Sequence, residues 1–235
     1  MAEIRVVATT ALKTSIDELT PEFERATGHR LHCSYGPSNR IAKQVAEGES
    51  NDVTIVAVER INELIDQGRL VKASSTDLAH SAMALAVQKG APKPDISTAE
   101  KFRDAMLKTR SLGMSNPVGG GTSGGVLARA FERLGIAEQM KPKLTFGPGG
   151  PAGLIGNFLL RKEVELGIQQ MPELMAVPGI DIVGPLPPGI QSISTFTAAL
   201  STAAKAPDAG RAFIEFMAST AAAAVFRAKG METPS

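Results

Sequence analysis

The residues whose types and spacing most clearly suggest chemistry form a glycine-rich segment, residues 117–125. It lies between an expected strand and an expected helix. Gly119, Gly121 and Gly124 satisfy the G-x-G-x-x-G pattern of dinucleotide-binding loops, but the next expected strand ends at 146–147 without the acidic residue that would hold a ribose. A Walker loop needs a lysine after its last glycine, and another glycine follows here. The segment therefore predicts no nucleotide cofactor, and no other cofactor is expected.

The same segment contains the G-x-S-x-G pattern of a hydrolase nucleophile elbow, centred on Ser123. The hydrolase order is serine, then an acid, then histidine, and no histidine follows His80, which excludes that triad. What remains is a glycine-rich turn that opens a helix, where free backbone N–H groups and the helix dipole favour an anion. The competing interpretation is a tight loop whose hydroxyl only caps the helix.

Similar polar residues stand at other expected helix starts, after the first and second strands. If the two halves of the chain face each other, these donors could converge on one small anion without a buried lysine or arginine. For each residue taken alone, an ordinary N-cap is the competing interpretation. The residues concerned are Thr9, Thr10, Ser38, Asn39, Thr122 and Ser123.

Alternating strand and helix patterns predict the elements that position these residues. The first expected strands cover 4–8, 30–35 and 53–57, and the first expected helices cover 12–26, 41–46 and 61–65. This order predicts a parallel, doubly wound α/β sheet in the first 70 residues, and such sheets bind ligands at the carboxyl ends of their strands. Pro21, with Thr20 as a cap before it, predicts a kinked or split first helix.

The middle of the chain repeats the α/β pattern, and the chain ends in two helices. The further expected strands cover 81–88, 111–115, 143–146, 164–168, 180–183 and 190–200, and the further expected helices cover 99–107, 124–134, 152–160, 207–217 and 219–229. The extended segments 81–88 and 190–200 flank the middle block. We therefore expect two doubly wound α/β lobes with a ligand cleft between them, residues 1–80 plus 195–235 as lobe one and 81–194 as lobe two.

Composition excludes several classes of protein. The 235 residues carry a net charge of +1, which argues against nucleic-acid binding, and 43% hydrophobic with 21% charged residues is typical of a folded domain. One cysteine and three scattered histidines predict neither disulfides nor a metal site. The longest apolar run, 221–226, is too short to enter a membrane, and the N-terminus lacks a signal-peptide pattern. As written, the chain is expected in the cytoplasm; removal of a signal peptide would place it in the periplasm.

Several segments, in order along nearly the whole chain, resemble the type II periplasmic solute-binding proteins, in particular the molybdate-binding-protein-like branch. These segments are Val7-Ala-Thr-Thr-Ala-Leu12, Phe23-Glu-Arg-Ala-Thr-Gly28, Gly36-Pro-Ser38 with Gln44 and Gly48, Asn51-Asp-Val53, Glu63-Leu-Ile-Asp-Gln-Gly68, Leu134-Gly135, Glu165-Leu-Gly-Ile168, and Ala212-Phe-Ile-Glu-Phe-Met-Ala-Ser219 with Gly230. The resemblance implies a small anionic ligand held between the lobes by hydroxyl and backbone N–H groups, and an ABC transporter membrane component as partner. It assigns ligand-binding positions to Thr10, Ser38, Ala57, Ser123 and Gln170.

Two departures from the molybdate binders bear on the ligand. Gln170 stands where they carry a tyrosine, and the Thr122-Ser123 turn replaces their P-A-G turn. Both changes add polar groups and room, which favours a small carboxylate over molybdate or tungstate. Arg40 could grip such a carboxylate at the cleft rim, and a solvated surface arginine is the competing interpretation.

The alternative function is an isomerase. Aconitate isomerase is similar to the same branch, so the resemblance implies that this fold can host an allylic proton shift on a tricarboxylate, which needs an acid–base group. His32, Glu59 and Glu173 are the titratable residues expected nearest the cleft; the competing interpretations are a strand histidine, a solvated helix-start acid and a structural cap. Cys33 is expected to point away from His32, as a small core residue.

Overall fold

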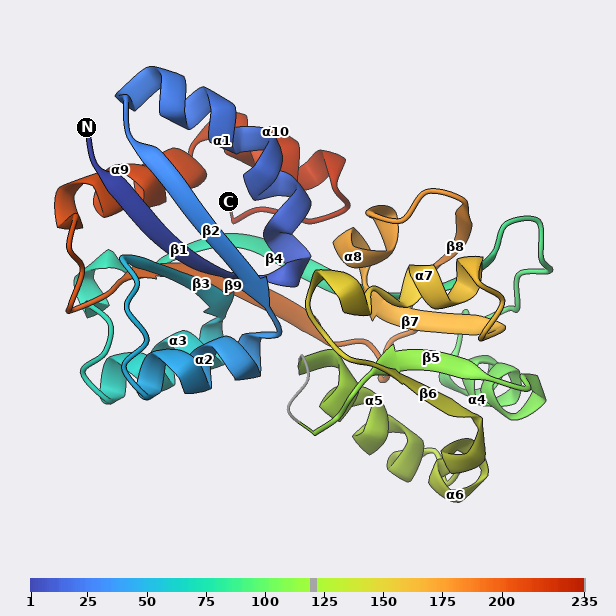
Figure 1. The fold of residues 1–235 in the computed structure, drawn as a ribbon. Coiled ribbons are helices and arrows are strands. Elements are labelled where there is room, and N and C mark those ends of the chain that lie inside the picture. Colours follow the sequence, from blue (N-terminus) through green and yellow to red (C-terminus); the bar gives the residue numbers. More distant parts are fainter. Residues whose placement is uncertain (119–121, 235) are drawn as a thin grey trace. The chain divides into compact units, whose positions relative to one another are not determined.

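The computed structural model describes residues 1–118 and 122–234 (Figure 1). The chain folds into two compact units: unit 1 is Met1–Ser81 with Ser194–Ser235, and unit 2 is Ala82–Ile193. The expected lobes, 1–80 plus 195–235 and 81–194, stay a prediction, because compact units need not be independent domains. Gly119 and Gly121 of the glycine-rich segment lie outside the described residues.

Unit 1 is a mixed sheet with helices on both faces. Its elements are β1 (Glu3–Thr9), η1 (Thr10–Leu12), α1 (Lys13–Thr27), β2 (Arg30–Gly36), α2 (Ser38–Ala46), β3 (Val53–Ala57), α3 (Val58–Asp66), η2 (Lys72–Ser74), the start of β4 (Thr76–Gln88), most of β9 (Ile193–Leu200), α9 (Pro207–Met217) and α10 (Thr220–Ala228). The strand order is β2-β1-β3-β9-β4. β1 runs parallel to β2 and β3, and β9 runs antiparallel to β3, so the parallel sheet expected in the first 70 residues is confirmed.

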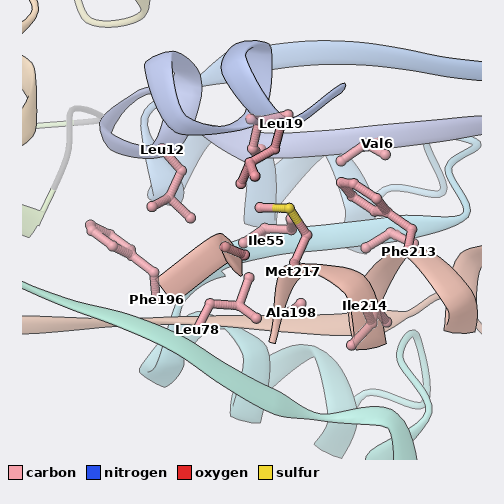
Figure 2. Packing of buried hydrophobic residues seen from close by; sticks show 14 of the residues in the cluster. Val6, Leu12, Leu19, Ile55, Leu78, Phe196, Ala198, Phe213, Ile214 and Met217 are labelled. Atoms are coloured by element: carbon pink, nitrogen blue, oxygen red, sulfur yellow. The ribbon is translucent and has the colours of Figure 1, made fainter. Parts of the chain in front are cut away.

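Successive residues of the central strands supply cores on opposite faces of this sheet. Val6 packs in a cluster with α1 and α9, whereas Val7 packs in another cluster with α2 and α3. Figure 2 shows Leu19 of α1 and Phe213 of α9 converging on the first of these cores, over Ile55 of β3. The two helical layers therefore bury both faces, which explains why β1 from Val6 onward and β3 are mostly apolar.

Helix α1 is continuous through Pro21, so of the expected kink or split the split is wrong. Thr20 does not cap a new helix, because its hydroxyl donates to the carbonyl of Ile16 at 2.7 Å, one turn earlier. Buried residues on both sides of the proline, including Phe23, anchor the helix to the core. This packing offsets the cost of a proline within a helix.

Unit 2 is also a mixed sheet between helical layers. Its elements are the rest of β4, α4 (Ala99–Lys108), β5 (Leu112–Ser115), α5 (Thr122–Arg133), α6 (Ala137–Met140), η3 (Lys141–Lys143), β6 (Leu144–Gly147), η4 (Pro151–Gly153), α7 (Ile155–Leu160), β7 (Leu166–Gln170), α8 (Met171–Met175) and β8 (Ile180–Pro185). The order is β8-β4-β7-β5-β6, with β5 parallel to β6 and β7, and β4 antiparallel to β7 and β8. One core lies under α4, α5 and α6, and a smaller core lies under α7.

The chain leaves unit 1 within β4, after Ser81, and returns at the start of β9. Within unit 2, Gln191 ties these two stretches together. Its side-chain oxygen accepts from the N–H of Met83 at 2.9 Å, and its side-chain nitrogen donates to the carbonyl of Met83 at 2.8 Å. The amide of Gln191 thus pairs with the backbone of β4 as a neighbouring strand would.

No single helix in the described part of the chain has the length and apolar composition of a membrane span. The pair α9 and α10, bent by 59° at their junction, passes that test only when the two are joined. Phe213 of α9 and Phe226 of α10 are both buried in the unit 1 core.

Candidate functional site

The first set of candidate residues lies at the carboxyl edge of the parallel strands of unit 1. Since β2, β1 and β3 are parallel, their carboxyl ends share one edge. Thr9 ends β1, Ala57 ends β3 and Ser38 follows β2, while Thr10 and Asn39 lie in the first turns of η1 and α2. The hydroxyl oxygen of Ser38 accepts from the N–H of Ala57 at 3.3 Å, which joins the ends of β2 and β3. The structure brings these five residues together, and we name them the unit 1 edge.

The helical segments at the unit 1 edge begin without side-chain caps. Within the described residues, no side chain at the N-cap positions Thr9, Pro37 and Ala57 accepts a hydrogen bond from η1, α2 or α3. By contrast, Thr98 and Ser219 cap α4 and α10. The hydroxyl of each accepts a hydrogen bond from a backbone N–H in the first turn of its helix at 3.2 Å. Thr9 therefore does not cap η1, and Ser38 bonds Ala57 in place of its own helix. Backbone N–H groups in the first turn of a helix favour an anion.

The hydroxyl of Thr10 is the least satisfied group at this edge. Thr10 is 6% exposed, and its side-chain oxygen is buried without a hydrogen-bond partner among the described residues. A buried hydroxyl left in that state costs about 1–3 kcal/mol. A bound acceptor would remove this cost, so the Thr10 hydroxyl is the strongest single indication of a ligand.

The second set lies at the carboxyl edge of unit 2. Ser123, in the first turn of α5, is buried, and its hydroxyl lies 3.3 Å from the hydroxyl of Ser115 at the end of β5. Thr122 begins the same helix and is half-buried. Gly124 allows the close approach of helix and strand, because a Cβ there would lie 2.4 Å from the carbonyl oxygen of Ser115. The glycine-rich segment thus seats α5 directly on the end of β5.

Gln170 lies beside this group, at the end of β7. The strand β7 is the parallel neighbour of β5, with Met114 opposite Ile168, so the ends of both strands share one edge. Gln170 is buried, and its backbone N–H donates to the carboxylate of Glu173, which is the carboxylate half of a capping box at the start of α8. Thr122, Ser123 and Gln170 form what we name the unit 2 edge.

Glu173 is held in a chain of polar contacts that begins at α7. The side-chain oxygen of Gln169 accepts from the N–H of Ile155 at 2.8 Å, and the side chain of Gln169 also bonds the carboxylate of Glu173. Burial raises the pKa of Glu173 to about 7, and the hydrogen bonds from Gln170 and Gln169 oppose that shift. The capping interpretation is therefore confirmed, and the same carboxyl can exchange a proton near neutral pH.

Three other charged or titratable residues named from the sequence are exposed. His32 is exposed in the middle of β2, 3.7 Å from Glu3, and Glu59 is an exposed acid in the first turn of α3. Arg40 is exposed and folds back over Gly36, where a Cβ would lie 2.8 Å from its guanidinium. These positions agree with a strand histidine, a solvated acid and a surface arginine.

Cys33 and Tyr35 occupy the α1 side of β2. Cys33 packs against the unit 1 core, as expected, and burial raises the pKa of its thiol to about 11, which keeps it protonated. The hydroxyl of Tyr35 donates to Asp17 at 2.8 Å, and Lys13 lies over its ring at 5.1 Å. Neither residue belongs to the two edges.

Sequence reasoning missed Gln169 and the short helix α8. Pro172 and Glu173 directly after an apolar strand are a helix-start signal that could have located α8. The contact between Gln169 and Ile155 joins distant residues and leaves no local pattern.

The donors that the structure places at both edges are neutral hydroxyl and amide groups. Among the described residues, no three His, Cys, Asp or Glu side chains gather as metal ligands would. Such donors can hold an anion by hydrogen bonds alone.

Comparisons with known proteins agree with this architecture. The family described as bacterial extracellular solute-binding protein matches residues 4–232. An aconitate isomerase of Pseudomonas sp is 33% identical over 97% of this chain and 87% of that protein. The molybdate-binding protein ModA of Escherichia coli is 22% identical over 79% of this chain and 72% of that protein. The periplasmic molybdate-binding protein of Azotobacter vinelandii has a TM-score of 0.80 at 18% identity, covering 99% and 100% of the two chains. The fold is therefore that of the type II periplasmic binding proteins, as expected, and the chain belongs to the bacterial extracellular solute-binding protein family.

Proposed function

We propose that the protein binds a small carboxylate anion through donors of the unit 1 edge and the unit 2 edge. The observation that carries this proposal is the buried, unpartnered hydroxyl of Thr10 beside three helical segments that start without side-chain caps. Each edge offers hydroxyl and amide donors of the kind that such an anion needs.

A carboxylate is favoured over a metal oxyanion by the unit 2 edge. Gln170 can donate and accept hydrogen bonds, which suits an organic acid that carries both carboxylate and hydroxyl groups. The relatives are consistent with small anions in general: their names concern aconitate and molybdate. The higher identity is to the relative that acts on a tricarboxylate.

Calorimetric titration with citrate, cis-aconitate, trans-aconitate and molybdate tests the proposal. Thr10→Ala should weaken carboxylate binding by about 1.5–3 kcal/mol, the range for a hydrogen bond to a charged group. Thr98→Ala is the matched control, because that hydroxyl caps α4 and should affect stability alone. Unchanged affinity in Thr10→Ala, or tight molybdate binding without any response to carboxylates, would refute the proposal.

We propose catalysis of an allylic proton shift on a tricarboxylate as the second candidate function. Glu173 favours it, because a carboxyl whose pKa is near 7 can take a proton from one carbon and return it to another. No proton is gained or lost overall, so no further reactant is needed.

Proton NMR of cis- and trans-aconitate with the protein in D₂O distinguishes the two functions. Interconversion with deuterium uptake, abolished in Glu173→Gln while binding persists, supports the enzyme. Saturable binding of an acid that stays chemically unchanged supports the binding function.

The partner and the compartment follow from the choice between these functions. The family is described as one of extracellular proteins, and one relative in Bacillus subtilis is named a putative ABC transporter substrate-binding lipoprotein. For the binding function, we propose delivery of the ligand to the membrane component of an ABC transporter. Fractionation of cells that carry the whole gene locates the protein, and periplasmic protein supports this proposal.

A further inference from the structure

We propose that unit 2 carries a second ligand site, for a small amphiphilic monocarboxylate, in a cavity at the edge of its sheet opposite Ser123 and Gln170. The cavity has a volume of about 430 Å³. Binding pockets for small molecules usually measure about 300–1,000 Å³. The inference is independent of the function proposed above.

The cavity lies away from the unit 2 edge because of the strand directions. It is lined by residues before β5 and at the start of β7, including Arg110 and Leu166, whereas Ser115 and Gln170 end those parallel strands. From Leu166 to Gln170 the strand rises by about 13 Å, in four steps of roughly 3.3 Å each. The antiparallel strand β4 reaches the same edge with its carboxyl end, at Val87.

The lining of the cavity is largely apolar. Val87 of β4, Ala105 of α4 and Leu166 of β7 are all buried and contribute aliphatic surface. Pro92 and Pro94, from the loop between β4 and α4, add further apolar surface. An inorganic anion would find few hydrogen bonds against such a lining, whereas an aromatic ring or a short alkyl chain would bury apolar area there.

The charged groups around the cavity are mostly cationic. Lys93, Lys108 and Arg110 line it together with one acid, Glu165. That acid is already satisfied, because it accepts from the backbone N–H of Arg110 at 2.8 Å and from the hydroxyl of Thr109 at 3.1 Å, and it pairs with the Arg110 guanidinium. These bonds hold the pKa of Glu165 below its usual range, so it stays ionised and paired.

The two lysines therefore remain to receive a ligand. Lys93 donates to the carbonyl of Ile182 at 2.9 Å and keeps two further hydrogens, while Lys108 contacts no charged or hydrogen-bonding partner in the described part of the chain. A carboxylate in the cavity can accept a hydrogen bond from either amine while its apolar body lies over Leu166 and Val87. A second carboxylate would meet apolar surface or Glu165, which is why a monocarboxylate fits better than a polycarboxylate.

NMR titration of the whole protein with phenylacetate, octanoate and citrate tests this inference. Saturable amide shifts at Val87 and Leu166 are expected from phenylacetate or octanoate. Lys108→Gln should weaken that binding about fivefold or more, the loss expected for a partly exposed charge-assisted hydrogen bond. In Ala105→Leu the larger side chain should fill part of the cavity, so this variant should also bind the ligand more weakly.

Lys89→Gln is the matched control, because Lys89 is exposed in the same unit and does not line the cavity. Equal effects of Lys108→Gln and Lys89→Gln would show attraction to overall charge and would overturn the proposal. Shifts confined to residues near Thr10, Ser123 and Gln170, or the absence of saturation for both monocarboxylates, would overturn it as well. Because the readout is resolved by residue, failure at this cavity is distinguishable from failure of the main site.

Discussion

Replacement of Glu173 by glutamine removes one titrating group and keeps its hydrogen bonds. The carboxylate of Glu173 accepts from Gln170 and Gln169, and a glutamine side-chain oxygen can accept in the same place. The variant therefore resembles the protonated form of the wild type. Any difference in stability that appears as the pH rises reports the cost of holding a negative charge at this half-buried position.

The size of that cost follows from the raised pKa. Folding moves the pKa of Glu173 from an ordinary 4.5 to about 7, so the folded state prefers the neutral acid. The corresponding contribution to the free energy of unfolding is complete below pH 4.5 and is lost as the pH rises to about 7. A shift of this size is worth on the order of 3 kcal/mol. We expect Glu173→Gln to gain about that much over the wild type between these pH values.

Urea unfolding followed by far-ultraviolet circular dichroism, at several pH values, measures this difference. Glu163→Gln is the control: Glu163 is exposed, and its hydrogen bond to Arg161 lowers its pKa, so its small effect has the opposite sign. A constant difference between Glu173→Gln and the wild type across the range would refute the reasoning. Direct NMR titration of the Glu173 side-chain carbon with a midpoint near 4.5 would refute it independently.

Further substitutions test the packing of α5 against the end of β5 and the stability of unit 1. Gly124→Ala should weaken anion binding and lower the midpoint of thermal unfolding, because the new Cβ would lie 2.4 Å from a backbone oxygen; Gly125→Ala, whose Cβ meets only a side chain at 3.5 Å, should be neutral or stabilising. Phe213→Ala should cost about 3–5 kcal/mol in urea unfolding, since Phe213 is fully buried beside another phenylalanine. Asp52→Ala should cost more than about 2 kcal/mol in the same assay, because three backbone N–H groups lose their charged acceptor.

The sequence predicted the main elements well because their periodicity reflects burial on one or both faces. The strands β1 and β3 read as apolar runs, and both are packed between helices. Helices α6 and α8, of four and five residues, are too short to show a helical period. The split expected at Pro21 fails because tertiary packing on both sides of it outweighs the local preference.

Site residues were predictable only as far as topology determines them. The rule that ligands bind at the carboxyl ends of parallel strands places Thr10 and Ser38 at one edge. Whether a hydroxyl caps its own helix or bonds a distant strand, as Ser38 does with Ala57, depends on sub-ångström geometry that sequence spacing does not carry. The raised pKa of Glu173 likewise arises from desolvation in the folded chain, which sequence spacing does not show.

The position of Tyr35 determines what optical spectroscopy can observe in this protein. It is the chain's single tyrosine, the chain has no tryptophan, and its hydroxyl bonds Asp17 within unit 1. Tyrosine emission and absorbance therefore come from unit 1 alone, and unit 2 contributes only weak phenylalanine signals. A tryptophan introduced at Phe131 of unit 2 would give each unit its own fluorophore. Unfolding of the two units could then be followed separately in one sample, and energy transfer between the fluorophores would report their separation as ligand is added.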